Sequence, residues 1–115
     1  MTEKEFAQTK GKTTIDPGVL VEISKLAALS VPGVTGLMAN AQTAAGFLSK
    51  STSNGIKIDV ENNTVYVDLY LKLSSEFDLY QTSQEVQEKV SRSIIEMVGM
   101  DVGQINVHIE DVTFS

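Results

Sequence analysis

Several residue types are absent or scarce in this chain of 115 residues, which has no cysteine and only one histidine. Without cysteine there can be no disulfide, no zinc–thiolate site and no cysteine nucleophile. The lack of cysteine also fits a reducing, intracellular compartment, in which disulfides are rare. These absences remove several classes of stabilising cross-link and catalytic centre.

Basic residues are outnumbered, with nine Lys and Arg against 15 Asp and Glu and a net charge of −6. Binding to nucleic acid relies on Lys and Arg that displace counterions from phosphates, and binding to anionic lipid needs the same charges. The charge balance therefore disfavours nucleic acid and direct lipid contact. No run of about 18 apolar residues occurs, and the polar N-terminus lacks the apolar segment of a signal peptide, so we expect neither membrane insertion nor secretion.

The length predicts a single domain. The polar residues 1–10 are expected to be a flexible tail, followed by one domain over residues 11–115. Residues 40–54 (NAQTAAGFLSKSTSN) predict a long loop with one helical turn near residues 44–48. Loops of this length are uncommon in compact domains unless they are mobile or functional. Phe47 and Leu48 are its large apolar residues, and they either pack onto the core or form a tip that binds a partner.

A first helix is predicted to begin at Asp16-Pro17, because Asp is a favoured N-cap and Pro a favoured first helical residue. Val31-Pro32-Gly33 is expected to end it, since the residue before Pro avoids the helical conformation. A short strand is expected to follow over residues 34–39. The apolar residues at helical spacing predict a core stripe formed by Val19, Leu20, Ile23, Leu26, Ala27 and Leu29.

The strongest local pattern is a β-hairpin in GIKIDVENNTVYVDLYLKL, which begins at Gly55. Apolar and polar residues alternate on both sides of Asn62-Asn63, and Asn tolerates the left-handed conformation of a type I′ turn. A two-residue turn at this point places the aliphatic side chains on one face and sets Lys57 opposite Asp68 as a favourable cross-strand pair. The register that this turn predicts pairs Val60 with Val65, Ile58 with Val67 and Ile56 with Leu69.

A second helix is predicted over residues 79–98, with Asp78 as its N-cap and Gly99 as its stop. Its expected core stripe is Leu79, Val86, Val90, Ile94 and Met97. A last strand is predicted over residues 104–112, with Ile105, Val107 and Ile109 facing inward, Asn106, His108 and Glu110 facing outward, and a bulge near Asp111. Together the elements predict an α+β fold: a two-layer sandwich in which two helices cover one face of a mainly antiparallel sheet, leaving a polar face open.

The sequence contains no recognisable catalytic motif. His108 and Glu110 are predicted on one strand face, but two ligands without a third at a set spacing are a weak metal signal. Asp68 and Asp78 are better explained by a cross-strand ion pair and a helix N-cap than by a catalytic pair. No G-x-S-x-G, G-x-G-x-x-G or P-loop motif is present, so we expect no enzymatic activity and no cofactor.

Two patterns bear on binding. Gly33-Val34-Thr35-Gly36 fits the G-x-x-G of RNA-binding KH loops, although no basic residue lies near it. Tyr66 and Tyr70 on the open face are similar to aromatic platforms that stack bases, but acidic residues share that face. A protein surface or self-association suits two tyrosines on a mixed polar face better. An accessory RNA-binding protein of KH-like type therefore remains the alternative.

Three segments together resemble the alkaline-shock-protein family, small stress-linked proteins of Gram-positive bacteria that are also associated with cell-envelope stress. The best matches are Pro32-Gly33-Val34 with Gly36 and Leu37, the VQEKV of residues 86–90, and the INVHI of residues 105–109. The resemblance covers residues 11–112, nearly the whole chain.

The resemblance implies a cytoplasmic, non-enzymatic protein that acts through protein–protein contacts as a scaffold in envelope homeostasis. It also implies assembly into homo-oligomers and recruitment to the membrane periphery by a separate anchor protein. It supplies no catalytic residue to carry over. The residues expected to bind a partner are Tyr66, Tyr70 and His108 on the open sheet face and Phe47 and Leu48 in the loop.

Overall fold

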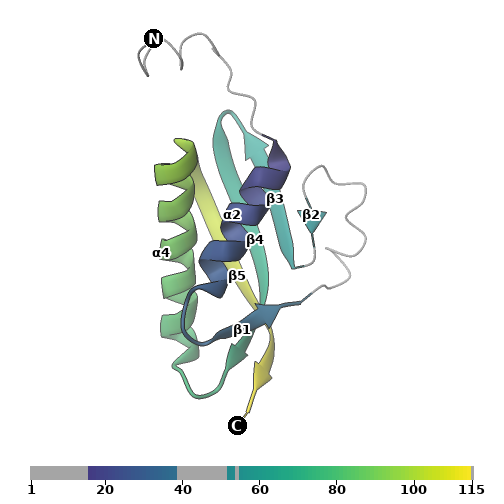
Figure 1. Ribbon diagram of the computed structural model, residues 1–115, viewed down its shortest axis with the longest axis vertical. Coiled ribbons are helices and arrows are strands. Elements are labelled where there is room, and N and C mark those ends of the chain that lie inside the picture. The colour runs from purple at the N-terminus through teal and green to yellow at the C-terminus, as the bar shows by residue number, and fades with distance from the viewer. Residues whose placement is uncertain (1–15, 39–51, 54, 115) are drawn as a thin grey trace.

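The computed structural model describes residues 16–38, 52–53 and 55–114. Among these described residues, two helices lie on one face of a five-stranded sheet, which confirms the predicted two-layer α+β fold (Figure 1). The predicted N-terminal tail and most of the predicted loop over residues 40–54, including Phe47 and Leu48, lie outside the described residues. Within that loop the structure places one short element, the strand β2 (Thr52–Ser53).

The helices begin and end where their capping residues predict. In α2 (Pro17–Leu29) the Asp16 side chain accepts a hydrogen bond from the amide of Gly18, with Pro17 as the first helical residue. In α4 (Leu79–Val98) the Asp78 side chain accepts from the amide of Gln81 at 3.0 Å, and Gly99 ends the helix in the left-handed conformation. The predicted starts of both helices and the predicted end of α4 are therefore confirmed, while α2 ends at Leu29, shortly before the predicted Val31-Pro32-Gly33.

The strands are β1 (Val34–Leu37), β2, β3 (Ile56–Glu61), β4 (Thr64–Ser74) and β5 (Asp101–Thr113). The long strand β4 is central: β3 and β1 pair antiparallel with it, and β5 pairs parallel with it. β2 pairs antiparallel with β3. The sheet is thus mainly antiparallel, as predicted, with one parallel pairing that the sequence pattern did not specify.

The hairpin between β3 and β4 has the predicted register. Asn62 and Asn63 both have positive φ, at 53° and 63°, as a type I′ turn requires. Val60 then pairs with Val65, and Lys57 lies opposite Asp68. Because side chains alternate along a strand, this register puts the hairpin's apolar residues on the helix side.

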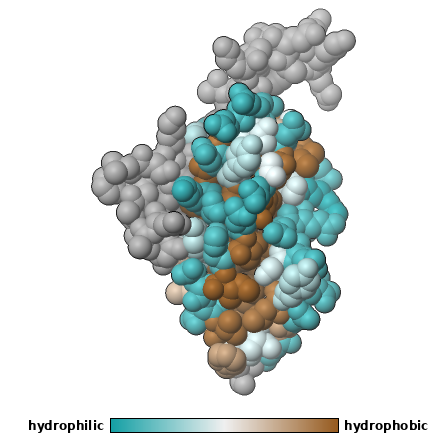
Figure 2. Space-filling model, turned by 180° about the vertical axis from the view of Figure 1, so that it is seen from behind, coloured by the Kyte–Doolittle hydropathy of each residue, from teal (hydrophilic) through white to brown (hydrophobic). Residues whose placement is uncertain are grey.

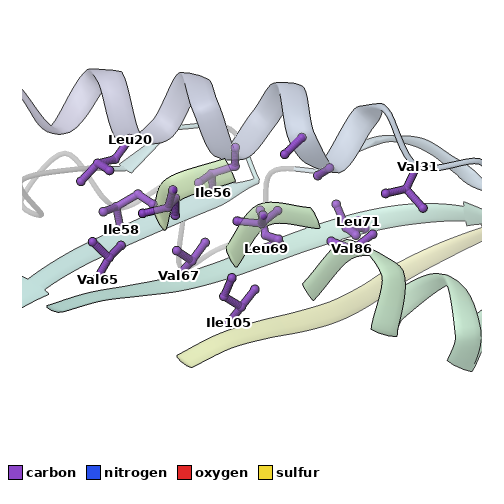
Figure 3. Close-up of a cluster of buried hydrophobic side chains, with 14 of the residues drawn as sticks. Leu20, Val31, Ile56, Ile58, Val65, Val67, Leu69, Leu71, Val86 and Ile105 are labelled. Carbon is purple, nitrogen blue, oxygen red and sulfur yellow. The ribbon is translucent and has the colours of Figure 1, made fainter. Parts of the chain in front are cut away.

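The core lies between the helices and the sheet (Figure 3). Fully buried side chains of β3 and β4 face α2 and α4 there, and Ile105 joins them from β5. The sheet contributes most of the core, while α4 adds a row at every fourth position. That row consists of Thr82, Val86, Val90 and Ile94, followed by the half-buried Val98.

Two predicted helix stripes need correction. Met97 was expected in the core but is 71% exposed, because a row at spacing four slants around the helix and Val98 takes the last inward position. In α2 the buried residues are Leu20, Ser24, Ala27 and Ala28. The predicted core residues Val19, Leu26 and Leu29 are exposed. The buried side of α2 thus consists mostly of small residues, and the helix packs there against α4, β3 and β1.

Candidate functional site

The face of the sheet opposite the helices carries the residues that the sequence predicted as a contact surface. β4 contributes alternate residues from Tyr66, and β5 contributes alternate residues from Gln104. The parallel register sets the two rows side by side. Its pairs are Tyr66 with Gln104, Asp68 with Asn106 and Tyr70 with His108. Adjacent strands therefore build one continuous polar and aromatic surface, here called the β4–β5 face.

A hydrogen-bonded cluster lies at the centre of the β4–β5 face. Asn106 Nδ2 donates to Asp68 Oδ1 at 3.1 Å, and His108 Nε2 lies 3.1 Å from the same oxygen. The His108 and Asp68 side chains are 42% and 28% exposed, so the contact is partly shielded from water. It becomes an ion pair when His108 is protonated. The described partners of Asp68 are thus on β5, whereas the sequence had assigned it to Lys57.

Tyr70 stacks on His108, with ring centroids 4.4 Å apart and ring planes 11° from parallel. Tyr70 is only 5% exposed, so a partner approaching this face meets the imidazole before the phenol ring. The stack and the Asp68 contact together fix the orientation of the imidazole. Tyr70 therefore packs against the imidazole as a buried ring, and His108 is the more exposed member of the stack.

Tyr66 is 36% exposed and lies over Gly103. A Cβ built on Gly103 would come within 2.5 Å of Tyr66 Cε2 and 2.9 Å of Thr64 Cγ2. The register of β4 and β5 shifts at this point, so Gly103 is the extra residue of a β-bulge. Sequence analysis did not assign Gly103 a role, although a glycine inside a strand is the usual sign of a bulge or a close approach.

The open face of the sheet was predicted to be polar, but the β4–β5 face is only partly polar. Figure 2 shows the molecule from behind, with hydrophilic side chains gathered over the upper half of this side and a hydrophobic band in the lower half. A mixed surface of this kind is typical of protein contacts. Tyr66, Tyr70 and His108 are brought together on it, while the other two predicted contact residues, Phe47 and Leu48, lie outside the described residues.

The described residues form no cluster of three or more His, Asp and Glu side chains that could hold a metal ion. The acidic neighbour of His108 is Asp68 on β4 and not Glu110, which was considered from the sequence. Two such groups can exchange a proton, but the structure brings no nucleophile to them in the part it describes. Neither described helix has the length and apolar character needed to cross a membrane.

The Gly33–Gly36 segment does not have the setting of a KH loop. It leads from α2 into strand β1, whereas a KH loop joins two helices. Gly33 has a φ of 102°, and a Cβ there would lie 3.1 Å from Phe77 Cγ and 3.0 Å from Thr82 Oγ1. Conformation and packing explain Gly33 without a nucleic-acid role.

Residues 5–114 match the model of the alkaline-shock-protein family, which is described as having a cell envelope-related function. Among curated proteins, the chain is 26% identical over 106 residues to the uncharacterized protein YqhY of Bacillus subtilis, covering 90% of this chain and 78% of the relative. It is 22% identical over 112 residues to the uncharacterized protein YloU of the same organism, covering 94% and 93%.

Among solved structures, the copper form of the MamM CTD superposes with a TM-score of 0.50 at 16% identity. The match covers 81% of this chain and 82% of that one. A variant of the same domain gives the same TM-score, with 93% of its chain covered. At this identity the likeness concerns the fold alone.

Proposed function

Because the chain belongs to the alkaline-shock-protein family, whose described function is related to the cell envelope, we propose that it is a non-catalytic scaffold protein of envelope homeostasis. It acts through protein–protein contacts on the β4–β5 face. The observation that carries this proposal is the ordered surface around Tyr66 and His108. Its side chains are held by one another and presented outward.

The chemistry of the cluster supports a binding role over a catalytic one. Asp68 Oδ1 is engaged by both Asn106 and His108, and the imidazole is stacked on Tyr70. A general base needs a substrate proton within hydrogen-bond reach in a pocket that shields it. Here the polar groups hold one another on a sheet face, which is an arrangement suited to fixing side-chain orientation for a partner.

The proposed partners are proteins, among them an anchor protein that recruits the chain to the membrane periphery from the cytoplasm, and further copies of the chain itself. Tyr66 is suited to such contacts, because tyrosine is enriched in protein interfaces and supplies a large area with few rotatable bonds. Its ring is held in place by packing on Gly103. A rigid aromatic side chain loses less conformational entropy on binding than a mobile one.

The test compares two tyrosines changed to the same residue. Tyr66→Glu places a charge on the β4–β5 face, whereas Tyr80→Glu places it on α4, where Tyr80 is 73% exposed. Tagged wild-type and variant proteins are purified from gently lysed native cells, with nuclease added to half of each sample, and their partners are identified by mass spectrometry.

We expect a nuclease-resistant set of envelope proteins with the wild type and Tyr80→Glu, and its loss with Tyr66→Glu. Circular dichroism and urea unfolding show whether each variant is folded. An unchanged partner set for folded Tyr66→Glu contradicts the proposal for this face. Partners that are ribosomal or RNA-binding and disappear with nuclease would support the RNA-binding alternative instead.

A further inference from the structure

The strand β5 lies at an edge of the described sheet. It runs for 13 residues and pairs along its length with β4 on one side. In the described part of the chain no strand pairs with its other side, and Figure 1 shows it beside α4 at this margin of the sheet. A strand at a sheet edge leaves alternate backbone N–H and C=O groups available for another chain.

A groove follows this edge. It has a volume of about 590 Å³ and lies between α4 and the stretch of β5 from Val102 to Asn106. Its lining mixes polar and apolar residues. They are Gln84, Gln87, Glu88 and Ser91 from α4 and Val102, Gly103, Gln104, Ile105 and Asn106 from β5.

One hydrogen bond in the groove shows that the backbone of β5 can bond an amide group on its outer side. Gln87 Nε2 donates to the backbone carbonyl of Ile105 at 2.9 Å. A side-chain amide has the same donor and acceptor groups as a peptide bond. The groove therefore already holds one amide against the backbone of the edge strand.

The acidic residues around the outer edge of β5 favour a basic segment as its binding partner. Asp101, Glu110 and Asp111 are exposed at the two ends of β5, and Glu88 lines the groove. Two nearby basic residues already have acidic neighbours within the chain. Arg92 forms an ion pair with Glu88, and Lys72 lies opposite Asp111 in the β4–β5 register. A second copy would bring the same acidic residues and its own net charge of −6. Opposite charge on the incoming strand relieves this repulsion, as cross-strand pairs do.

We propose that the outer edge of β5 binds an extended, Lys- or Arg-bearing segment of a partner protein as an added strand. This inference rests on the proposed function and names the kind of partner that one surface takes. Ile109, which is 41% exposed and shares the helix side with Leu71, offers an apolar contact to alternate residues of that segment. Backbone hydrogen bonds supply affinity in this mode of recognition, and alternate side chains supply specificity.

The test uses the full chain, labelled with ¹⁵N, and an acetylated, amidated ten-residue peptide of alternating Val and Lys. Titration followed by NMR is expected to shift the amide signals of β5 and of the α4 residues that line the groove. Amides of β5 that do not bond to β4 are expected to exchange with deuterium more slowly once the peptide is bound. A peptide of alternating Val and Glu is expected to leave both unchanged.

Two backbone-modified peptides test strand pairing directly. In one the Val amides are N-methylated, and in the other the Lys amides. Because alternate residues of a strand present their N–H groups to opposite sides, methylation of one set is expected to abolish binding and methylation of the other to preserve it. Equal binding by both methylated peptides would overturn the proposal, since it would show attraction without strand pairing.

Charge variants locate the site on the protein. The double variant Asp101→Asn/Glu110→Gln is expected to weaken binding about fivefold, because two exposed ion pairs are lost. Asp59→Asn/Glu61→Gln makes the same charge change on β3 and is expected to leave affinity within about twofold. Equal weakening by both doubles, or no binding of the basic peptide at all, would overturn the proposal.

The free protein provides a further check by light scattering and amide exchange. A dimer whose β5 edge amides are already protected would assign the edge to a second copy and overturn the proposal. Failure of this edge-strand proposal can be told apart from failure of the proposed scaffold function. If the edge binds no peptide while Tyr66→Glu still loses its envelope partners, only the edge assignment is wrong.

Discussion

At the scale of single residues, the β4–β5 face depends on Gly103. The ring of Tyr66 occupies the space that any larger residue at position 103 would need. The sequence shows the glycine and the tyrosine 37 positions apart and gives no sign that they meet. Their contact follows from the parallel pairing of β4 with β5 and from the bulge between them.

Replacing this glycine tests the contact. Gly103→Ala is expected to displace the Tyr66 ring and to lower the free energy of unfolding by about 1–3 kcal/mol, the usual cost of adding a carbon to a packed site. Urea unfolding measures the change. Gly36→Ala is the matched control, because a Cβ at Gly36 would meet nothing within 4 Å. Part of the cost should vanish in a Tyr66→Ala background, where Thr64 Cγ2 still lies 2.9 Å from the added Cβ. A full cost there would show that the ring is not its cause.

At the scale of elements, local chemistry explains what sequence reasoning predicted well. The hairpin register follows from two residues that adopt positive φ, Asn62 and Asn63, flanked by alternating apolar residues. The ends of α2 and α4 follow from caps next to them in sequence. The buried stripes of the helices were predicted less well. Met97 and Leu26 fit the helical spacing of apolar residues, but that spacing does not show whether a neighbouring element covers them.

The hairpin turn gives an element-scale prediction. Asn63→Gly is expected to keep or slightly raise stability, since glycine adopts positive φ without strain. Asn63→Val is expected to lower the free energy of unfolding by about 1–2 kcal/mol, the cost of the left-handed conformation for other residues. Thermal and urea unfolding compare the two with Asp59→Val, which puts valine at an exposed strand position of β3. Equal effects of valine at the two positions would refute the role of the turn.

At the scale of the whole molecule, the two layers decide which side of α2 is inside. The helix is apolar nearly all round, with Glu22 and Lys25 as its charged residues. The sheet and α4 together bury the side that carries Leu20 and the small residues and leave Leu26 60% exposed. Three of the four buried residues of α2 are small, Ser24, Ala27 and Ala28, whereas the larger Val19, Leu26 and Leu29 face outward.

This layer arrangement predicts a clear difference between two leucines of α2. Leu20→Ala is expected to lower the free energy of unfolding by about 2–5 kcal/mol, as for other fully buried leucines. Leu26→Ala should change it by about 0.5 kcal/mol or less, because the side chain is mainly exposed. Urea unfolding of both variants measures the difference. Similar losses at the two positions would mean that α2 packs through the other face.

The sequence by itself determined the hairpin, its register, both helix caps and the α+β class, because these depend on residues close together in the chain. Family membership was also visible in its motifs. Only the tertiary structure decided that β5 runs parallel to β4, that Asp68 bonds His108 across 40 positions, and that Tyr70 is buried and stacked on the imidazole. Such contacts arise when distant segments pack into shared layers, and the local pattern of one strand is compatible with either a parallel or an antiparallel neighbour.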